Sequence, residues 1–301
     1  MRWLIYAIIS VITAAFWELF SKFSSSNNPI YNNIIIYFTA SLLSLLFLFS
    51  SKKEFRLSRC GLFSGFLAGI GNIFFLFALS ENNLTIIAPF VSLSGVIFFF
   101  FYYMHERPKY SNHQKFLVLC GFILSISGVF IVSIGKFGLL DFFNSVITNP
   151  SYLLFGSGTA ILFGAATYFT FLSDAKEKQT EEIYLFSNFL SSLICALFIL
   201  LVFSLNFFPK FQDRGLNNYL YPFSSGVLVF LAVLFAFKAF TRTHSKKGFE
   251  QTIISIIVNS EAIPILLISY VLLSEFVPFA FAGTILAIMG LSLINYAAKL
   301  K

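Results

Sequence analysis

Apolar residues fill ten runs of about 20 residues in this chain, and short polar stretches separate most of them. A helix of that length, rising 1.5 Å per residue, crosses a hydrocarbon core of about 30 Å. The pattern therefore predicts ten membrane-spanning helices. They cover residues 3–22, 31–51, 60–80, 84–103, 114–135, 152–173, 183–206, 219–241, 252–273 and 277–298.

The composition supports a membrane protein. Hydrophobic residues make up 58% of the 301 residues, charged residues only 11%, and the mean hydropathy is +0.85. Soluble domains carry about 25% charged residues, so we expect an all-α membrane protein whose immediate partner is the lipid bilayer. The net charge of +7 does not indicate nucleic-acid binding, because the positive residues lie at the ends of apolar segments rather than along one face.

The positive residues also predict the orientation of the chain. Fifteen of the 20 Lys and Arg residues fall on one side of the ten segments, and four fall on the other. Cytoplasmic loops are enriched in Lys and Arg. We therefore predict a multi-pass protein of the cell membrane with both termini in the cytoplasm.

The two halves of the chain resemble each other. Aligning the first segment with the sixth sets TAAFWELF against GAATYFTF, so that Trp17 meets Tyr168. The same offset pairs Ser41 with Ser192. In addition, TIIAPFVSLSG of the fourth segment resembles TIISIIVNSEA of the ninth. Several correspondences in the same order indicate an internal repeat.

Five spans in each repeat is an odd number, so the second copy must enter the membrane from the opposite side. We predict inverted repeats of five helices, residues 1–136 and 152–301, around a central cavity. An extracytoplasmic linker, residues 137–151, joins them. Inverted repeats are the architecture that lets a central site open alternately to either face.

The strongest candidate for a functional residue is Glu261. It lies about 11 residues into its segment and therefore close to the middle of the membrane. A carboxylate at that depth costs a few kcal/mol unless it faces a partner or a watery cavity. It either pairs with a cationic substrate or binds a proton, or it is a protonated carboxyl that bonds a neighbouring helix.

Aromatic and polar residues elsewhere add to this site. Trp17 and Glu18 combine an aromatic face with a carboxylate, which suits an organic cation, and Tyr168 matches Trp17 in the other half. The alternative is that Trp17 anchors the helix at the interface and that Glu18 reaches outside water.

Four uncharged polar residues lie in otherwise apolar runs. They either bind substrate or form bonds between helices. Ser92 and Ser94 align with Asn259 and Glu261, which favours a shared central site. The four are Asn72, Ser92, Ser94 and Asn259.

Both halves contain a helix that ends in Glu, followed by a Gly-rich helix. These stretches read LSGVIFFFFYYMHE...GFILSISG and EAIPILLISYVLLSE...GTILAIMG. In this pattern the chain resembles the EamA-type branch of the drug/metabolite transporter superfamily, over residues 3–298. The resemblance implies a carrier of small metabolites such as amino acids, nucleotide sugars, quaternary amines or S-adenosylmethionine.

We therefore predict a secondary active transporter that works by alternating access. Its expected substrate is a small zwitterionic or cationic metabolite, such as an amino acid, S-adenosylmethionine or a choline-like amine. The alternative is an exporter of neutral or aromatic metabolites or drugs. A proton or a counter-substrate would couple the transport.

Catalysis is not expected. The sequence shows no nucleotide-binding motif and no spacing of metal ligands, so we expect no cofactor and no metal. An integral-membrane lipid-modifying enzyme is the remaining alternative. The three histidines lie near helix ends rather than in a cluster, which disfavours it.

Overall fold

The computed structural model describes most of the chain. The described residues are 2–24, 28–53, 55–81, 84–106, 110–137, 151–204, 217–242, 254, 257, 262–274 and 278–299. Within them the chain is helical and contains no strand.

Long helices make up the described chain. They are α1 (Arg2–Ser24), α2 (Pro29–Ser50), α3 (Arg59–Glu81), α4 (Leu84–Glu106), α5 (Asn112–Phe137), α7 (Ser151–Leu172), α8 (Glu181–Ser204), α9 (Asn217–Thr241), α11 (Ala262–Leu273) and α12 (Pro278–Lys299), with a short π-helix, η1 (Ser173–Glu177). Seven of the described helices, α1, α2, α3, α5, α7, α8 and α9, are long and apolar enough to cross a membrane. This is consistent with the all-α membrane protein that the sequence predicts.

The predicted segments agree with these helices. Nine of them match a described helix to within three residues at each end. For the segment 252–273, α11 matches the second half, and Ile254 and Ile257 are also helical.

Polar caps fix where two of the helices begin. The side chain of Asn28 accepts a hydrogen bond from the Ile30 N–H at the start of α2, 2.9 Å away, and Pro29 occupies the first helical position. At the start of α3 the Ser58 hydroxyl accepts from the Gly61 N–H at 2.8 Å. Both caps satisfy N–H groups that have no partner inside the helix.

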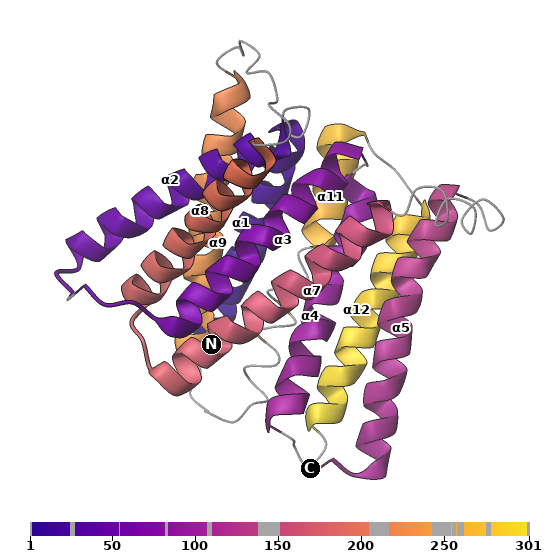
Figure 1. Ribbon diagram of the computed structural model, residues 1–301. Coiled ribbons are helices and arrows are strands. Elements are labelled where there is room, and N and C mark those ends of the chain that lie inside the picture. Colours follow the sequence, from indigo (N-terminus) through magenta and orange to yellow (C-terminus); the bar gives the residue numbers. More distant parts are fainter. Residues whose placement is uncertain are drawn as a thin grey trace.

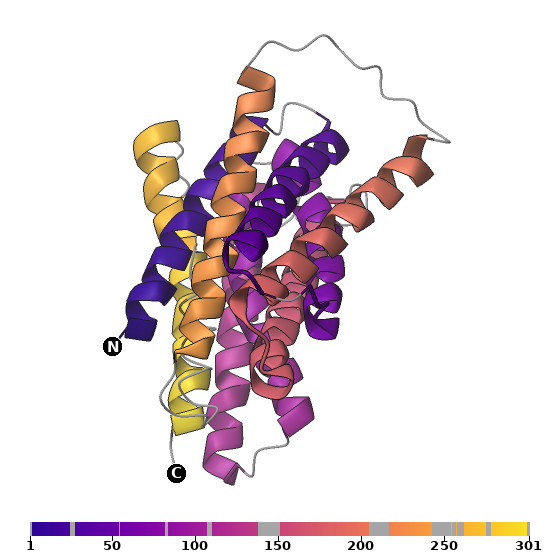
Figure 2. The ribbon, with the colours of Figure 1, turned by 90° about the vertical axis from the view of Figure 1, so that its left-hand side faces the viewer.

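The helices form one bundle. α5 and α12 lie side by side along one edge, α2, α8 and α9 form the opposite edge, and α3 and α7 lie between them (Figure 1). The view turned by 90° shows α1 beside α9 (Figure 2). Both chain ends lie toward the same end of the bundle (Figure 1).

α5 and α12 run antiparallel in close contact. Gln114 near the start of α5 donates to the Ala297 carbonyl near the end of α12 at 3.0 Å, and Ser125 donates to the Ala287 carbonyl at 3.2 Å. The backbones approach closely because glycines face each other: a Cβ at Gly121 would lie 2.6 Å from the carbonyl oxygen of Gly290. Small residues at helix contacts are typical of membrane bundles.

A Ser-Gly pair in α3 and another in α9 make matching contacts. Ser64 donates to the carbonyl of Ala166 in α7 at 3.0 Å, and its hydroxyl lies 3.3 Å from that of Thr170, four residues later. Ser225 donates to the carbonyl of Trp17 in α1 at 3.0 Å, and its hydroxyl lies 2.9 Å from that of Ser21, also four residues later.

The glycines that follow these serines match as well. A Cβ at Gly65 would lie 2.7 Å from the carbonyl carbon of Asn188 in α8, and one at Gly226 would lie 2.6 Å from the carbonyl oxygen of Ile36 in α2. α3 thus packs on α7 and α8 in the way that α9 packs on α1 and α2.

Candidate functional site

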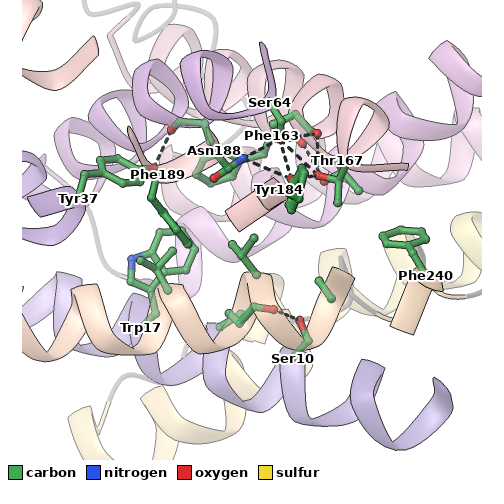
Figure 3. Close-up of a pocket in the computed structure, with 18 residues that line it drawn as sticks. Ser10, Trp17, Tyr37, Ser64, Phe163, Thr167, Tyr184, Asn188, Phe189 and Phe240 are labelled. Atoms are coloured by element: carbon green, nitrogen blue, oxygen red, sulfur yellow. Dashed lines mark hydrogen bonds between the residues drawn. The ribbon is translucent and has the colours of Figure 1, made fainter. Parts of the chain in front are cut away.

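A cavity lies between α1, α2 and α3 and α7, α8 and α9. Its empty volume is about 820 Å³, part of which is open to the surroundings. Apolar side chains and aromatic rings form most of the wall (Figure 3). None of the described residues that line it carries a charge.

One side of the cavity is polar. The hydroxyl of Tyr184 in α8 lies 2.6 Å from that of Thr170 and 3.1 Å from that of Ser64. The Asn188 amide nitrogen, one helical turn after Tyr184, donates to Ser64 at 2.9 Å and to Tyr184 at 3.3 Å. Three helices, α3, α7 and α8, therefore meet in one hydrogen-bond network (Figure 3).

Packing fixes the position of this network. The ring of Tyr184 stacks on Phe237 of α9 with centroids 4.4 Å apart and planes 9° apart. The absence of a side chain at Gly65 lets α3 approach the Asn188 backbone, where Ser192 also donates to the Gly65 carbonyl at 2.8 Å. Locked partners of this kind hold a binding group in one orientation.

Trp17 belongs to the aromatic part of the wall. The side chain is 6% exposed, and its ring centroid lies 5.4 Å from that of Phe75 and 6.0 Å from that of Phe163. Among the described residues its indole N–H has no hydrogen-bond partner. Trp17 thus lines the cavity, and its role as a substrate-binding residue stays a prediction.

Glu18, Asn72 and Tyr168 do not join Trp17 in the described wall of the cavity. Glu18 is fully buried on the same helix. Asn72 is also fully buried, and it donates to the Asn33 side chain at 2.6 Å, so it bonds α3 to α2. Tyr168 packs in a separate aromatic cluster with Phe101, 5.9 Å away.

The remaining predicted residues belong to α4 and to the region before α11. Ser94 is fully buried in α4, where its carbonyl faces Gly164 of α7, and it is not among the described residues of the cavity wall. The side chain of Ser92 lies outside the part of the chain that the structure describes, as do Asn259 and Glu261. The predicted carboxylate site therefore stays a prediction.

The polar wall was not anticipated from the sequence. Tyr184, Asn188 and Ser192 recur every four residues in α8, which places them on one helix face. Ser64 and Thr170 each stand in an apolar run of a different helix. The four-residue spacing in α8 is the signal that identifies this face.

A second polar cluster lies where α7 ends. The carboxylate of Glu177 in η1 accepts from the Ser58 hydroxyl at 2.6 Å and from the Cys60 N–H at 3.0 Å, so it caps α3. Nearby, Lys238 of α9 pairs with Glu181 of α8 at 3.5 Å. The Glu177 contacts tie the two halves of the chain together, and the Lys238–Glu181 pair joins two helices of the second half.

Comparisons with known proteins identify the fold only. No protein-family model matches the chain, and a search of curated proteins finds no match. A solved structure described as "Crystal structure of protein" superposes with a TM-score of 0.64 and covers 98% of this chain and 97% of that chain. The two sequences are 12% identical, so the likeness shows the fold alone.

Proposed function

We propose that this chain is a secondary transporter of the cell membrane that works by alternating access. Its two units are inverted repeats, residues 1–136 and 152–301, each with five membrane-spanning helices. Residues 137–151 join them on the extracytoplasmic side. The substrate occupies the cavity between the two units.

The cavity is the main observation that supports this proposal. Three helices from each half line it, and they are the corresponding ones in each repeat: α1, α2 and α3 in the first, α7, α8 and α9 in the second. Binding at the interface of inverted repeats is the arrangement that allows a site to open to either side.

The packing of the helices supports the inverted repeat. The contacts of Ser64 and Gly65 in the first half recur for Ser225 and Gly226 in the second. α5 and α12, which correspond to each other, run antiparallel. The matching contacts pair Trp17 with Ala166 rather than with Tyr168.

The orientation and the family are part of the proposal. The excess of Lys and Arg beside one set of loops supports cytoplasmic termini, and both chain ends lie toward the same end of the bundle (Figure 1). The sequence resemblance supports membership of the EamA-type transporters.

Two substrate classes remain in the proposal. The aromatic wall around Trp17 supports a small cationic or zwitterionic metabolite through cation–π attraction, with Glu18 and Glu261 as candidate carboxylates. The uncharged described lining supports a neutral or aromatic substrate. A proton or a counter-substrate drives either one.

Uptake into proteoliposomes tests the proposal. The purified chain should take up at least one of labelled choline, phenylalanine and S-adenosylmethionine, or exchange a neutral aromatic compound, and the flux should saturate. Ala166→Trp should abolish it, because the larger ring fills the cavity.

The matched control is Ile161→Trp on the outer face of the same helix, where the side chain is 50% exposed, and it should retain flux. Glu261→Gln tests the predicted carboxylate. Absence of any flux from correctly folded protein, or equal flux in Ala166→Trp, contradicts the proposal.

A further inference from the structure

Every N–H and O–H group in the hydrogen-bond network of the polar wall donates to another group of the protein. The two Asn188 amide hydrogens go to Ser64 and Tyr184, the Thr170 hydroxyl can donate to Tyr184, and the Tyr184 hydroxyl can donate to Ser64. Ser64 donates to the carbonyl of Ala166, whose other lone pair accepts the backbone N–H of Thr170 within α7. This arrangement satisfies each donor in the network.

The other hydroxyl groups of the wall are satisfied in the same way. Each donates to a backbone carbonyl: Ser10 to Ala232 at 2.8 Å, Tyr37 to Ala68 at 3.0 Å and Thr167 to Phe163 at 2.9 Å. The Trp17 indole nitrogen has no partner among the described residues, but it has less than 1 Å² of accessible surface. The ring carbons of Trp17 therefore face the cavity, and its N–H is shut off from it.

The side-chain amide oxygen of Asn188 is left without a hydrogen bond among the described residues. Asn188 itself lines the cavity. The amide nitrogen points to Ser64 and Tyr184 (Figure 3), so the oxygen on the other branch of the planar group points away from them. The described wall thus offers a hydrogen-bond acceptor and no free donor.

A wall that offers an acceptor but no free donor favours some ligands over others. An N–H or O–H group finds an acceptor at Asn188. A carboxylate or phosphate finds neither a cation nor a free donor in the described lining, and a buried charge without partners is costly. A purely apolar molecule leaves Asn188 without a partner.

Resting on the transport function proposed above, we propose that Asn188 determines substrate specificity by accepting a hydrogen bond from the substrate. The substrate class is an amine or alcohol with an apolar or aromatic body and no carboxylate. This narrows the predicted range, since amino acids and S-adenosylmethionine carry a carboxylate. Ammonium and hydroxyl groups share the donor chemistry, and the experiment distinguishes them.

Equilibrium binding to the full-length protein in detergent tests the inference. The probes share a phenyl ring on a two-carbon chain: 2-phenylethylamine, 2-phenylethanol, phenylalanine, 3-phenylpropionate and ethylbenzene. Thermal shift measures binding because a ligand of the folded state raises Tm. A Trp3→Phe background leaves Trp17 as the single tryptophan, so its fluorescence reports occupancy of the cavity.

We expect the amine, the alcohol or both to bind at least ten-fold more tightly than the other three probes. Asn188→Leu should weaken that binding ten-fold or more. Asn188→Asp should tighten the binding of the amine relative to the alcohol ten-fold or more, a change of selectivity that a structural role would not produce. Ile194→Ala, on the exposed face of α8 and outside the described cavity wall, should leave the selectivity unchanged.

Tightest binding of 3-phenylpropionate or phenylalanine overturns the inference, as does the binding of none of the donor probes. Unchanged binding by folded Asn188→Leu or unchanged selectivity in Asn188→Asp also overturns it. The experiments distinguish a failure of the proposed transport function from a failure of this inference. Selective binding without flux into proteoliposomes contradicts the transporter and leaves the binding site standing, whereas flux of an anion alone contradicts the inference and leaves the transporter standing.

Discussion

Gly65→Ala tests whether close contact between α3 and α8 builds the polar wall. The new Cβ would lie 2.7 Å from the Asn188 carbonyl carbon and closer still to the carbonyl oxygen, whereas ordinary contacts begin at 3.4 Å. The helices must therefore separate by at least about 0.7 Å, the difference between these two distances. The Ser192 bond to the Gly65 carbonyl, now 2.8 Å, would stretch beyond the usual range.

The expected loss of stability in Gly65→Ala combines several effects. Overpacking costs about 1–3 kcal/mol, and each stretched interhelical hydrogen bond about 0.6–1 kcal/mol. Alanine is favoured over glycine within a helix by about 0.5–1 kcal/mol. The free energy of unfolding should therefore fall by about 1–3 kcal/mol, and binding of the 2-phenylethyl probes should weaken.

Reversible unfolding in mixed detergent micelles measures this loss. Gly71→Ala on the same helix is the matched control, since its Cβ meets ring atoms of the Phe163 side chain at 2.9 Å rather than backbone. A ring can shift where a backbone cannot, so we expect a change of less than about 1 kcal/mol. Equal free energies of unfolding for the two variants would refute the reasoning.

Three further substitutions probe the rest of the bundle in the same unfolding assay. Gly226→Ala should destabilise the protein by about 1–3 kcal/mol, since its Cβ would lie 2.6 Å from the Ile36 carbonyl oxygen; a neutral result would break the match with Gly65. Glu177→Gln should cost about 1–2 kcal/mol, because the cap on the Cys60 N–H loses its charge; no change would mean that the cap is dispensable. Lys238→Met should change stability by less than about 1 kcal/mol, because both partners of its ion pair are 20–25% exposed, and a larger loss would contradict this estimate.

The helices could be predicted from the sequence because long apolar runs between charged residues mark them directly. The segment 3–22, for example, corresponds to α1 (Arg2–Ser24). Such boundaries depend only on local composition and on the thickness of the bilayer.

The polar wall could not be predicted in the same way. Ser64, Thr170 and Asn188 belong to three helices, and each is an isolated polar residue in an apolar run. Only packing of α3 on α7 and α8 brings them together. Trp17 is a candidate from the sequence alone because an aromatic ring beside a carboxylate is a signal in itself, and it lines the cavity.

The internal repeat illustrates the same limit. A gap-free alignment pairs Trp17 with Tyr168, whereas the contacts of Ser64 and Ser225 pair Trp17 with Ala166. Apolar helices share too few distinctive residues for a sequence alignment of the two halves to be accurate to better than two positions. Interhelical hydrogen bonds fix it, because each joins two specific atoms.

Cysteine accessibility tests most directly whether the cavity opens to both sides of the membrane. In a chain without Cys60, Cys120 and Cys195, Ala68→Cys places a thiol in the cavity wall. Membrane-impermeant thiol reagents should label it from either side of sealed vesicles, and a bound 2-phenylethyl probe should protect it. Ala78→Cys on the same helix, 1% exposed and outside the described cavity wall, should stay unlabelled. Labelling of Ala68→Cys from one side only, or from neither, would contradict alternating access through this cavity.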